Sequence, residues 1–352
     1  CEADNRNSAA LNALATAGVP LITDAFDPVN AGAGLMHNKF VVIDGRGGVA
    51  DSVWVWTGSW NPTDPGTNLD YQNAMEIQDP ALAGAFVTEF NEMWGSTTES
   101  PNAAVSRFGA RKTDNTPHRF IIGGRRVSCY FSPSDHTTSY IIDAVNSAQA
   151  SIYFSLLTLT RSDIANALLA RHTAGLRVLG AIDSKDDQGS QYDYLVGKGM
   201  DIRLKAGSGL LHHKYAVLSA DWGANWDRVN HPTVITGSHN WTNAAENSNN
   251  ENTLIVEDDT VALAYLQEFA ARYTQFGGTG TITVGVDQVD AGIPETMGLI
   301  QNYPNPFNGM TMIGVRVRGG TGTAVQVRVQ VFDILGREVA TLVDGPMTPG
   351  TY

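Results

Sequence analysis

Apolar residues along the chain alternate between spacings typical of helices and spacings typical of strands. Residues 8–17 and 162–173 have apolar positions at helical spacing, and Gly18 and Gly175 follow them as helix stops. Short apolar runs between such segments predict strands at residues 40–43, 53–57, 127–131, 151–157, 178–182, 215–218 and 233–236. Alternation of this kind favours a layered α/β sandwich.

The order of these elements repeats. Residues 71–79 resemble residues 250–258, and each stretch is followed by a helical segment, ending in Glu89-Phe90 and in Glu268-Phe269. A period near half of the chain argues for a duplicated domain rather than a solenoid of short repeats. We therefore expect two pseudo-symmetric α-β-α sandwich halves.

The composition changes near residue 274. A Gly- and Thr-rich link at residues 275–281 leads into a segment almost without helical spacing. Residues 324–332 alternate valine with other residues, as is typical of a half-buried strand, and residues 311–317 predict another strand. The C-terminal part is therefore expected to be a separate β-domain.

Composition limits the classes of function. The 352 residues are 42% hydrophobic and carry a net charge of −13. No apolar run has transmembrane length, so no integral membrane segment is expected. Residues before 281 carry 19 basic and 30 acidic side chains. This acidic balance counts against broad nucleic-acid binding.

One local excess of basic residues departs from this balance, opposed only by Asp114. It comprises Arg107, Arg111, Lys112, Arg119, Arg125 and Arg126. Because charge runs in polar linkers are commonly solvated, we interpret it as a solvated connector between the halves. A locally basic cleft is the alternative. Cys1 and Cys129 are too few for a disulfide framework, so we expect buried small hydrophobes, with a single bond between them as the alternative.

A small set of polar residues occurs once in each half. A His-x-Lys triplet opens a strand at residues 37–39 and again at 212–214, and a Gly-Ser-x-Asn quartet ends a strand at 58–61 and 237–240. Side chains i and i+2 of a strand point to one face, so each His and its Lys share a face. The glycine allows a tight turn after the strand. The candidate site residues are His37, Lys39, Ser59, Asn61, His212, Lys214, Ser238 and Asn240.

Two such sites facing each other would surround one small anion with imidazoles, ammonium groups and neutral donors. The ammonium groups can offset the negative charge that makes a phosphodiester poorly electrophilic. Imidazole titrates near neutrality, which suits both nucleophilic attack and proton transfer. The sequence has no Cys/His cluster with zinc spacing and no Gly-x-x-x-x-Gly-Lys loop. We therefore expect phosphoryl transfer with no metal and no cofactor.

These motifs closely resemble the phospholipase D superfamily, whose signature is His-x-Lys, four residues, Asp, and then Gly-Ser-x-x-Asn or a close variant. The first copy fits, with Asp44 at the acidic position, whereas the second has Ser219 there. In the superfamily a later carboxylate steadies the catalytic imidazole. Glu251 matches it in the second copy, and Gln72 occupies that column in the first. The resemblance covers roughly residues 1–275.

The resemblance implies roles for these residues. His37 would be the nucleophile that forms a covalent phosphohistidine, and His212 would be the acid and base. Lys39 and Lys214 would complete the catalytic set, Ser59, Asn61, Ser238 and Asn240 would bind phosphate, and Asp44, Gln72 and Glu251 would support them. His213 and His239, also within the motifs, are expected to point away or to line the cleft.

Three functions are compatible with this site. The first is a phosphodiesterase of phospholipase D type that hydrolyses or transfers phosphodiesters of phospholipids. The second is a nonspecific endonuclease of the same superfamily, favoured by compact motifs and by the basic residues 107–126. The third is a catalytically inactive surface-binding protein, favoured by Ser219 and Gln72.

The C-terminal segment resembles another known family. Residues 301–308 read Gln-Asn-Tyr-Pro-Asn-Pro-Phe-Asn, residues 333–339 contain Asp-Ile-Leu-Gly-Arg, and residues 349–352 read Pro-Gly-Thr-Tyr. This pattern resembles the C-terminal sorting domain of type IX secretion, which is an immunoglobulin-like β-sandwich. The resemblance implies a secreted or cell-surface protein that engages the type IX secretion machinery.

We expect five segments in all. They are a first phospholipase D-like half at 1–100, a connector at 101–126, a second half at 127–274, a linker at 275–298 and a sorting domain at 299–352. The first half lacks counterparts of residues 127–157, so we expect a chain truncated at its N-terminus, with a signal peptide in the missing part. The sorting-domain pattern continues past Pro-Gly-Thr-Tyr, so we expect the C-terminus to be truncated as well. The first sheet should then be incomplete and have an exposed edge.

Overall fold

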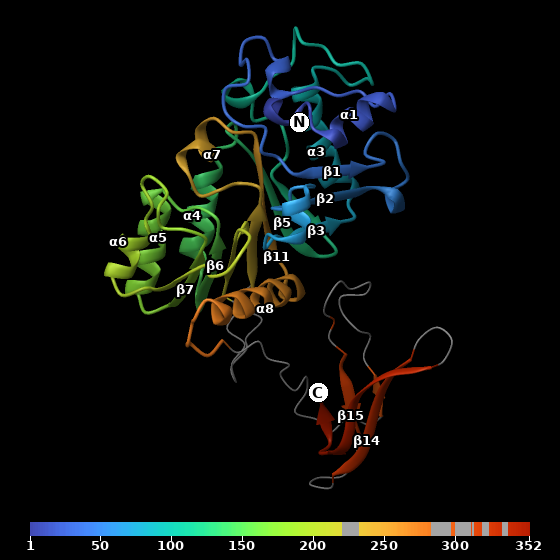
Figure 1. Cartoon of the computed structure of the whole chain (residues 1–352), viewed down its shortest axis with the longest axis vertical. Coiled ribbons are helices and arrows are strands. Elements are labelled where there is room, and N and C mark those ends of the chain that lie inside the picture. The colour runs from blue at the N-terminus through green and yellow to red at the C-terminus, as the bar shows by residue number, and fades with distance from the viewer. Residues whose placement is uncertain (220–231, 283–296, 300–310, 312, 319–323, 333–336) are drawn as a thin grey trace. The chain divides into compact units, whose positions relative to one another are not determined.

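The computed structural model describes residues 1–219, 232–282, 297–299, 311, 313–318, 324–332 and 337–352 (Figure 1). The chain divides into two compact units, Cys1–Thr283 and Val284–Tyr352. This division falls inside the predicted linker, and the finer domain boundaries stay predictions. Within the described ranges, no helix has both the length and the apolar character needed to cross a bilayer.

The first unit contains two sheets. A three-stranded antiparallel sheet has the order β1(Phe40–Ile43), β2(Trp54–Gly58), β3(Ala74–Ile77). An eight-stranded mixed sheet has the order β4(Arg119–Ile122), β5(Arg125–Ser132), β11(Glu251–Glu257), β10(Thr233–Gly237), β9(Lys214–Leu218), β6(Ser151–Leu156), β7(Arg177–Ile182), β8(Asp201–Leu204). The neighbours β6, β7 and β8 are parallel, and the other neighbours are antiparallel. The predicted α/β class is therefore confirmed, and each predicted strand of this unit is present.

Helices and short 3-10 turns connect these strands. They are η1(Ala3–Asn5), α1(Ala9–Thr16), η2(Asp24–Phe26), η3(Ala50–Ser52), α2(Asp64–Asn68), α3(Pro80–Trp94), η4(Gly109–Arg111), α4(Thr137–Ser147), α5(Ser162–Thr173), α6(Tyr192–Gly197), α7(Asn243–Asn247) and α8(Asp259–Gln275). Asp79 caps α3 by accepting the Leu82 N–H, and Asp258 caps α8 in the same way at Thr260 and Val261. The caps of the two matching helices thus occupy matching positions of the repeat.

The large sheet is covered by helices on both faces (Figure 1). Alternation along β6 sends Ile152 and Phe154 into one core with α4 and α5. Tyr153 points to the other face, where its ring lies 5.3 Å from that of Phe269 on α8. All six residues of β6 are therefore buried, and its apolar residues Ile152, Tyr153 and Phe154 are consecutive instead of alternating with polar ones.

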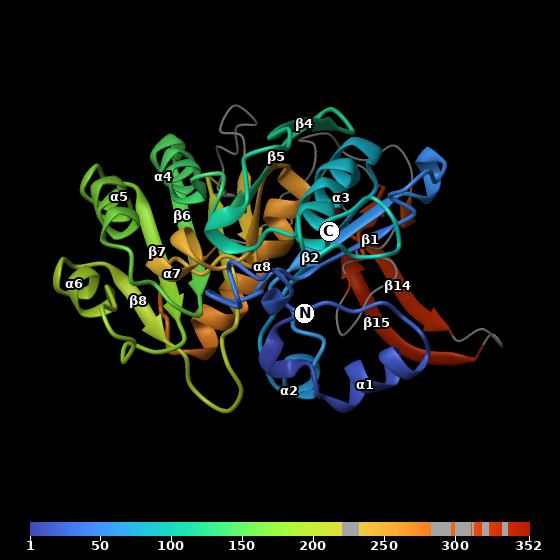
Figure 2. The same cartoon turned by 90° about the horizontal axis from the view of Figure 1, so that it is seen from above.

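A second core joins the two halves. Phe86 of α3 packs between the small sheet and the face of β5 and β11, and its ring lies 5.0 Å from that of Phe131. α3 lies against β1 and β2 (Figure 2). Cys129 is buried in this core and Cys1 is half-buried, and both are free thiols. The alternative of a bond between them is therefore wrong.

Two of the basic residues at 107–126 pair with buried carboxylates, whereas the others stay exposed at the surface. Lys112 is buried and lies 2.5 Å from the buried carboxylate of Glu89, and Arg111 pairs with buried Asp27. The other pairs are Arg107 with Glu92, Arg125 with Asp258 and Asp259, and Arg126 with Glu257. The prediction of a solvated connector is therefore wrong for Lys112 and Arg111, because burial requires a charge to be paired.

The C-terminal unit contains two small sheets among its described residues. β12(Gly298–Leu299), β13(Val315–Val317) and β16(Gly350–Thr351) form one, and β14(Val325–Phe332) and β15(Glu338–Met347) form the other. Val315, Val317, Val327 and Val329 are buried together, as the alternation predicts. Residues 301–308 and 333–336 of the sorting motif lie outside the described residues, so the immunoglobulin-like fold stays a prediction.

Candidate active site

Each His-x-Lys triplet enters its strand through contacts with the other half. Met36 forms a parallel bridge with Asn250, and the His37 N–H donates to the Asn250 carbonyl at 3.1 Å. In the mirrored position Leu211 bridges Tyr71, and the His212 N–H donates to the Tyr71 carbonyl at 2.9 Å. The two histidine motifs are therefore tied together by backbone hydrogen bonds across the interface.

The two imidazoles face each other. Their ring centroids are 6.5 Å apart with an interplanar angle of 64°. Lys39 Nζ donates to the His37 carbonyl at 2.7 Å, and Lys214 Nζ donates to the His212 carbonyl at 2.8 Å. Both lysine side chains are buried. The predicted meeting of the two motifs at one interface is confirmed.

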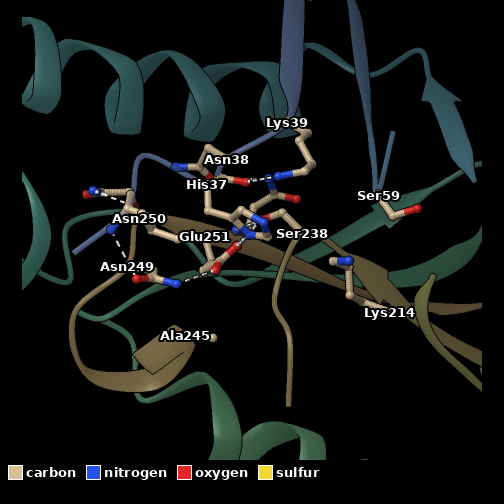
Figure 3. Close-up of polar contacts among 12 residues, drawn as sticks. His37, Asn38, Lys39, Ser59, Lys214, Ser238, Ala245, Asn249, Asn250 and Glu251 are labelled. Atoms are coloured by element: carbon tan, nitrogen blue, oxygen red, sulfur yellow. Dashed lines mark hydrogen bonds and ion pairs between the residues drawn. The ribbon is translucent and has the colours of Figure 1, made fainter. Parts of the chain in front are cut away.

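Each imidazole has its hydrogen-bond partner in the opposite half. His37 Nδ1 lies 2.7 Å from Glu251 Oε2 (Figure 3), and His212 Nδ1 lies 2.8 Å from Gln72 Oε1 and 3.1 Å from the Ser59 carbonyl. All of these partners are acceptors, so Nδ1 carries the proton in both rings and Nε2 keeps its lone pair. The sequence repeat identified Glu251 and Gln72 as supporting residues, but it did not predict that each of them bonds the histidine of the opposite half.

The charges of the site are unequal. Burial alone would raise the pKa of Glu251, but His37 and Lys39 hold it at about 2, so this carboxylate is ionised. Burial lowers the pKa of His37, and Glu251 opposes that effect. His212 has no carboxylate partner, and burial together with Lys214, Lys39 and His37 lowers its pKa to about 2.

Burial also disfavours the charged form of both lysine side chains. Burial lowers the pKa of Lys39 to about 8, and burial together with Lys39 lowers the pKa of Lys214 well below its usual range. A bound anion would offset this crowding of positive groups. The site is therefore electrostatically arranged to receive an anion.

The Gly-Ser-x-Asn quartets form the walls. A Cβ on Gly58 or Gly237 would lie 2.3 Å from a backbone carbonyl of the next strand, so each position requires glycine. Ser59 Oγ donates to Asn73 Oδ1 at 3.0 Å, and Ser238 Oγ donates to Glu251 Oε2 at 2.7 Å. Both hydroxyl protons are therefore held within the protein, and the predicted role of these serines as phosphate ligands is untested.

Three predicted residues remain, namely Asn61, Asn240 and Asp44. The Asn61 N–H donates to Gln72 Oε1 at 3.1 Å, and Asn240 Oδ1 is buried with no hydrogen-bond partner among the described residues. Asp44 is exposed at the far end of β1 from Lys39, so it does not join the site. Asp44 and Ser219 have matching positive φ values of 53° and 56°, which makes their position a turn position in both halves.

Sequence reasoning missed a mirrored pair of asparagines behind the histidines. Asn73 Nδ2 donates to Thr236 Oγ1 at 2.8 Å, and Thr57 Oγ1 donates to Asn252 Oδ1 at 2.8 Å. His213 Nδ1 lies 3.1 Å from Asn73 Oδ1, so this histidine points away from the site. The signal that could have found them is that Asn73 and Asn252 match in the repeat.

His239 is also buried behind the wall of the second half. Its Nε2 lies 3.6 Å from Glu246 Oε2. Its position in the quartet corresponds to Trp60 of the first half, whose indole donates to Thr67 instead. His239 therefore does not join the pair of facing imidazoles.

Comparison with known proteins agrees with this arrangement. The family described as "Cardiolipin synthase, PLD-like domain" matches residues 2–94 and 141–273. Mitochondrial cardiolipin hydrolase of Xenopus tropicalis is 32% identical over 154 residues, which cover 43% of this chain and 68% of that protein. Phospholipase D of Rickettsia bellii is 28% identical over 154 residues, covering 43% of this chain and 71% of that protein.

Two solved structures match parts of the chain. One is Nuc, a phospholipase D family member from Salmonella typhimurium, at 26% identity and a TM-score of 0.37, covering 44% of this chain and 98% of that one. The other is phosphatidylserine synthase of Haemophilus influenzae, at 12% identity and a TM-score of 0.46, covering 72% of this chain and 64% of that one.

The family match extends over well more than half of the chain and includes both histidine motifs. The two sequence relatives, a cardiolipin hydrolase and a phospholipase D, are hydrolases. The chain belongs to the phospholipase D-like superfamily of phosphodiesterases.

Proposed function

We propose that this protein hydrolyses or transfers phosphodiesters of phospholipids through a phosphohistidine intermediate, without a metal. The observation that carries the proposal is the pair of imidazoles 6.5 Å apart, each with Nδ1 held by an acceptor and Nε2 free to react. Two buried lysines beside them supply the positive charge that a phosphodiester needs.

His37 is the nucleophile in this proposal. Its Nε2 forms a bond to phosphorus while the bond from phosphorus to the leaving alcohol oxygen breaks. Glu251 raises the basicity of the imidazole and stabilises the positive charge that develops on it, and Gln72 gives His212 no such charge. The carboxylate partner therefore favours His37 over His212 as the attacking group.

His212 is the acid and then the base. The anionic substrate offsets the charges of Lys39 and Lys214 and so allows His212 to be protonated. Its Nε2 proton goes to the departing alkoxide. In the second step a water gives a proton to His212, its oxygen bonds to phosphorus, and the bond from His37 to phosphorus breaks. When an alcohol takes the place of water, the product is a new diester.

The phospholipid substrate rests on two supports. Relatives named cardiolipin hydrolase and phospholipase D are 32% and 28% identical to this chain over 154 residues each. In addition, the basic residues that favoured a nuclease are largely engaged in ion pairs, including the buried Lys112–Glu89 pair. A basic track for a nucleic-acid backbone therefore loses Lys112 and Arg111, while Arg107, Arg119, Arg125 and Arg126 stay exposed. The facing imidazoles with their acceptors also argue against an inactive binding protein.

We further propose export by type IX secretion, and a secreted or cell-surface location, on the strength of the C-terminal motif. A reporter that carries a signal peptide at its N-terminus and residues 284–352 at its C-terminus, expressed in a bacterium that has this machinery, should appear outside the cell, whereas the same reporter without residues 284–352 should be retained. Equal retention of both reporters would contradict the proposal.

Assays of the protein on phosphatidylcholine or cardiolipin vesicles and on single-stranded DNA, all with excess EDTA, test the proposed function. We expect turnover of the lipid, no loss with EDTA, and an acid-labile phosphoryl label on His37. His37→Asn and His212→Asn should each reduce turnover by several orders of magnitude. His172→Asn, on α5 outside the site, is the matched control. Cleavage of DNA alone would favour the nuclease, and loss of activity with EDTA would contradict the scheme.

A further inference from the structure

We infer that Glu2 and Asp183 are positioning residues for His37 and His212, and that each acts through the backbone amide just before its histidine. The inference rests on the proposed function, because it assigns those histidines to catalysis. Neither carboxylate belongs to the paired motifs, and both lie far from them in the sequence.

The geometry is the same in both halves. Glu2 Oε2 accepts the Met36 N–H at 2.6 Å, over a separation of 34 residues. Asp183 Oδ1 accepts the Leu211 N–H at 2.6 Å, over a separation of 28 residues. Glu2 precedes η1, and Asp183 directly follows β7, so different local structures deliver a carboxylate to the same place.

These bonds complete a clamp around each histidine. The N–H of His212 donates to the Tyr71 carbonyl, and the carbonyl of His212 accepts from Lys214. With the Leu211 N–H held by Asp183, hydrogen bonds fix three backbone groups in a row, namely the Leu211 N–H, the His212 N–H and the His212 carbonyl. A charge-assisted hydrogen bond is shorter and stronger than a neutral one, so the bonds made by Asp183 and Lys214 are the stronger members of the clamp.

The clamp controls where the imidazole points. Nε2 of His212 must face the substrate while Nδ1 stays on Gln72, and a small rotation of the backbone moves both. Asp183 also faces Lys214 and raises its pKa against the effect of burial. Asp183 therefore positions the histidine and helps to keep the neighbouring ammonium charged.

The mirrored arrangement argues against coincidence. Glu2 and Asp183 are different side chains, one glutamate and one aspartate, yet each accepts the amide N–H that precedes a histidine of the site. The acceptor is retained although the side chain differs. This is the expected pattern when the contact itself is needed.

Asp183→Ala and Asp183→Asn in the full chain test the inference, with bis(p-nitrophenyl) phosphate as a small diester. Asp183→Ala should lower kcat by roughly 10–100-fold with KM changed by about twofold or less, as when a supporting partner of a catalytic group is removed. Asp183→Asn keeps an acceptor oxygen and should recover most of kcat. Asp186→Ala, an exposed neighbour, is the control and should match the wild type.

A second readout separates positioning from folding. The amide proton resonance of Leu211 and the Nδ1 proton of His212 should shift in Asp183→Ala while the unfolding transition stays cooperative. Glu2→Ala and Glu2→Gln form the second pair and should repeat the pattern at Met36 and His37, which keeps the test decisive if Asp183→Ala does not fold.

The outcomes are distinguishable. An inactive wild type would overturn the proposed function, and the two resonances would still test the clamp. An active wild type with kcat unchanged in Asp183→Ala would overturn the inference alone, as would a loss in Asp183→Asn as large as that in Asp183→Ala.

Discussion

The two halves of the first unit carry the same motifs on sheets of very different extent. In the second half, β9 is flanked by β10 and β6, and β7 and β8 extend the sheet. In the first half, β1 pairs only with β2 among the described residues. As a result Val41 and Ile43 are 52% and 50% exposed, whereas the matching Ala216 and Leu218 are 0% and 1% exposed. The predicted incomplete first sheet with its exposed edge is therefore confirmed.

Despite this difference, the site is nearly symmetric. Each His motif is anchored to the opposite half by a backbone hydrogen bond, an acceptor on Nδ1 and an asparagine network. The comparison shows that the geometry of the histidines depends on the interface between halves and on α3, more than on the extent of either sheet. The remaining asymmetry is chemical, since one half supplies a carboxylate and the other an amide.

The largest expected effect comes from removing that chemical asymmetry. Glu251→Gln should lower kcat by roughly 10²–10⁴-fold, because His37 loses the charge that stabilises its phosphorylated form. Gln72→Glu gives His212 a carboxylate and should raise its pKa, so the rate should peak at a higher pH. Steady-state rates across pH on a soluble diester measure both. Equal effects of Glu251→Gln and Gln72→Ala would contradict the assigned roles.

The second prediction compares the two strands at matched positions. Leu218→Ala should lower the free energy of unfolding by about 2–5 kcal/mol, because it opens a cavity in a closed core. Ile43→Ala should cost about 1 kcal/mol or less, because its side chain is half exposed at the sheet edge. Urea denaturation of both variants gives the values. Similar losses would mean that β1 is covered in solution.

The sequence predicted much of this fold because the signals were local. Strand β6 was recognised as an apolar run, helices α1 and α5 by their spacing and their glycine stops, and the site by two copies of a motif in similar flanks. Repetition removed the ambiguity that a single His-x-Lys would have left.

The parts that were missed depend on contacts between distant residues. The pairing of Glu251 with His37 instead of His212 follows from how the halves face each other, which no local pattern encodes. Lys112 was interpreted as solvated because its partner Glu89 lies on a helix of the first half. The hydrogen bonds of Glu2 and Asp183 to Met36 and Leu211 join residues that are 34 and 28 positions apart, so no local pattern predicts them.

The last prediction concerns how the free energy of unfolding depends on pH through the two histidines. The pKa of His212 is about 2 in the folded protein against an ordinary value of 6.5, so the unfolded chain binds more protons between these values. Stability is therefore fully present above about pH 6.5 and falls as the pH is lowered. Between pH 7 and pH 5 the loss from His212 should be about 2 kcal/mol. His37, whose pKa is also lowered, adds in the same direction and is opposed by Glu251.

Urea denaturation at pH 7 and pH 5 excludes the contribution of Glu251, which has a pKa of about 2 against an ordinary 4.5 and loses its contribution only below about pH 4.5. His212→Gln should reduce the difference between the two pH values by about 2 kcal/mol, with the remainder coming from His37 and His213, whose pKa values burial also lowers. His172→Gln on α5 should leave the difference unchanged. If His212→Gln lost as much stability as the wild type on acidification, the imidazole would already be charged in the folded protein. The two halves would then differ less in charge than their partners Glu251 and Gln72 indicate.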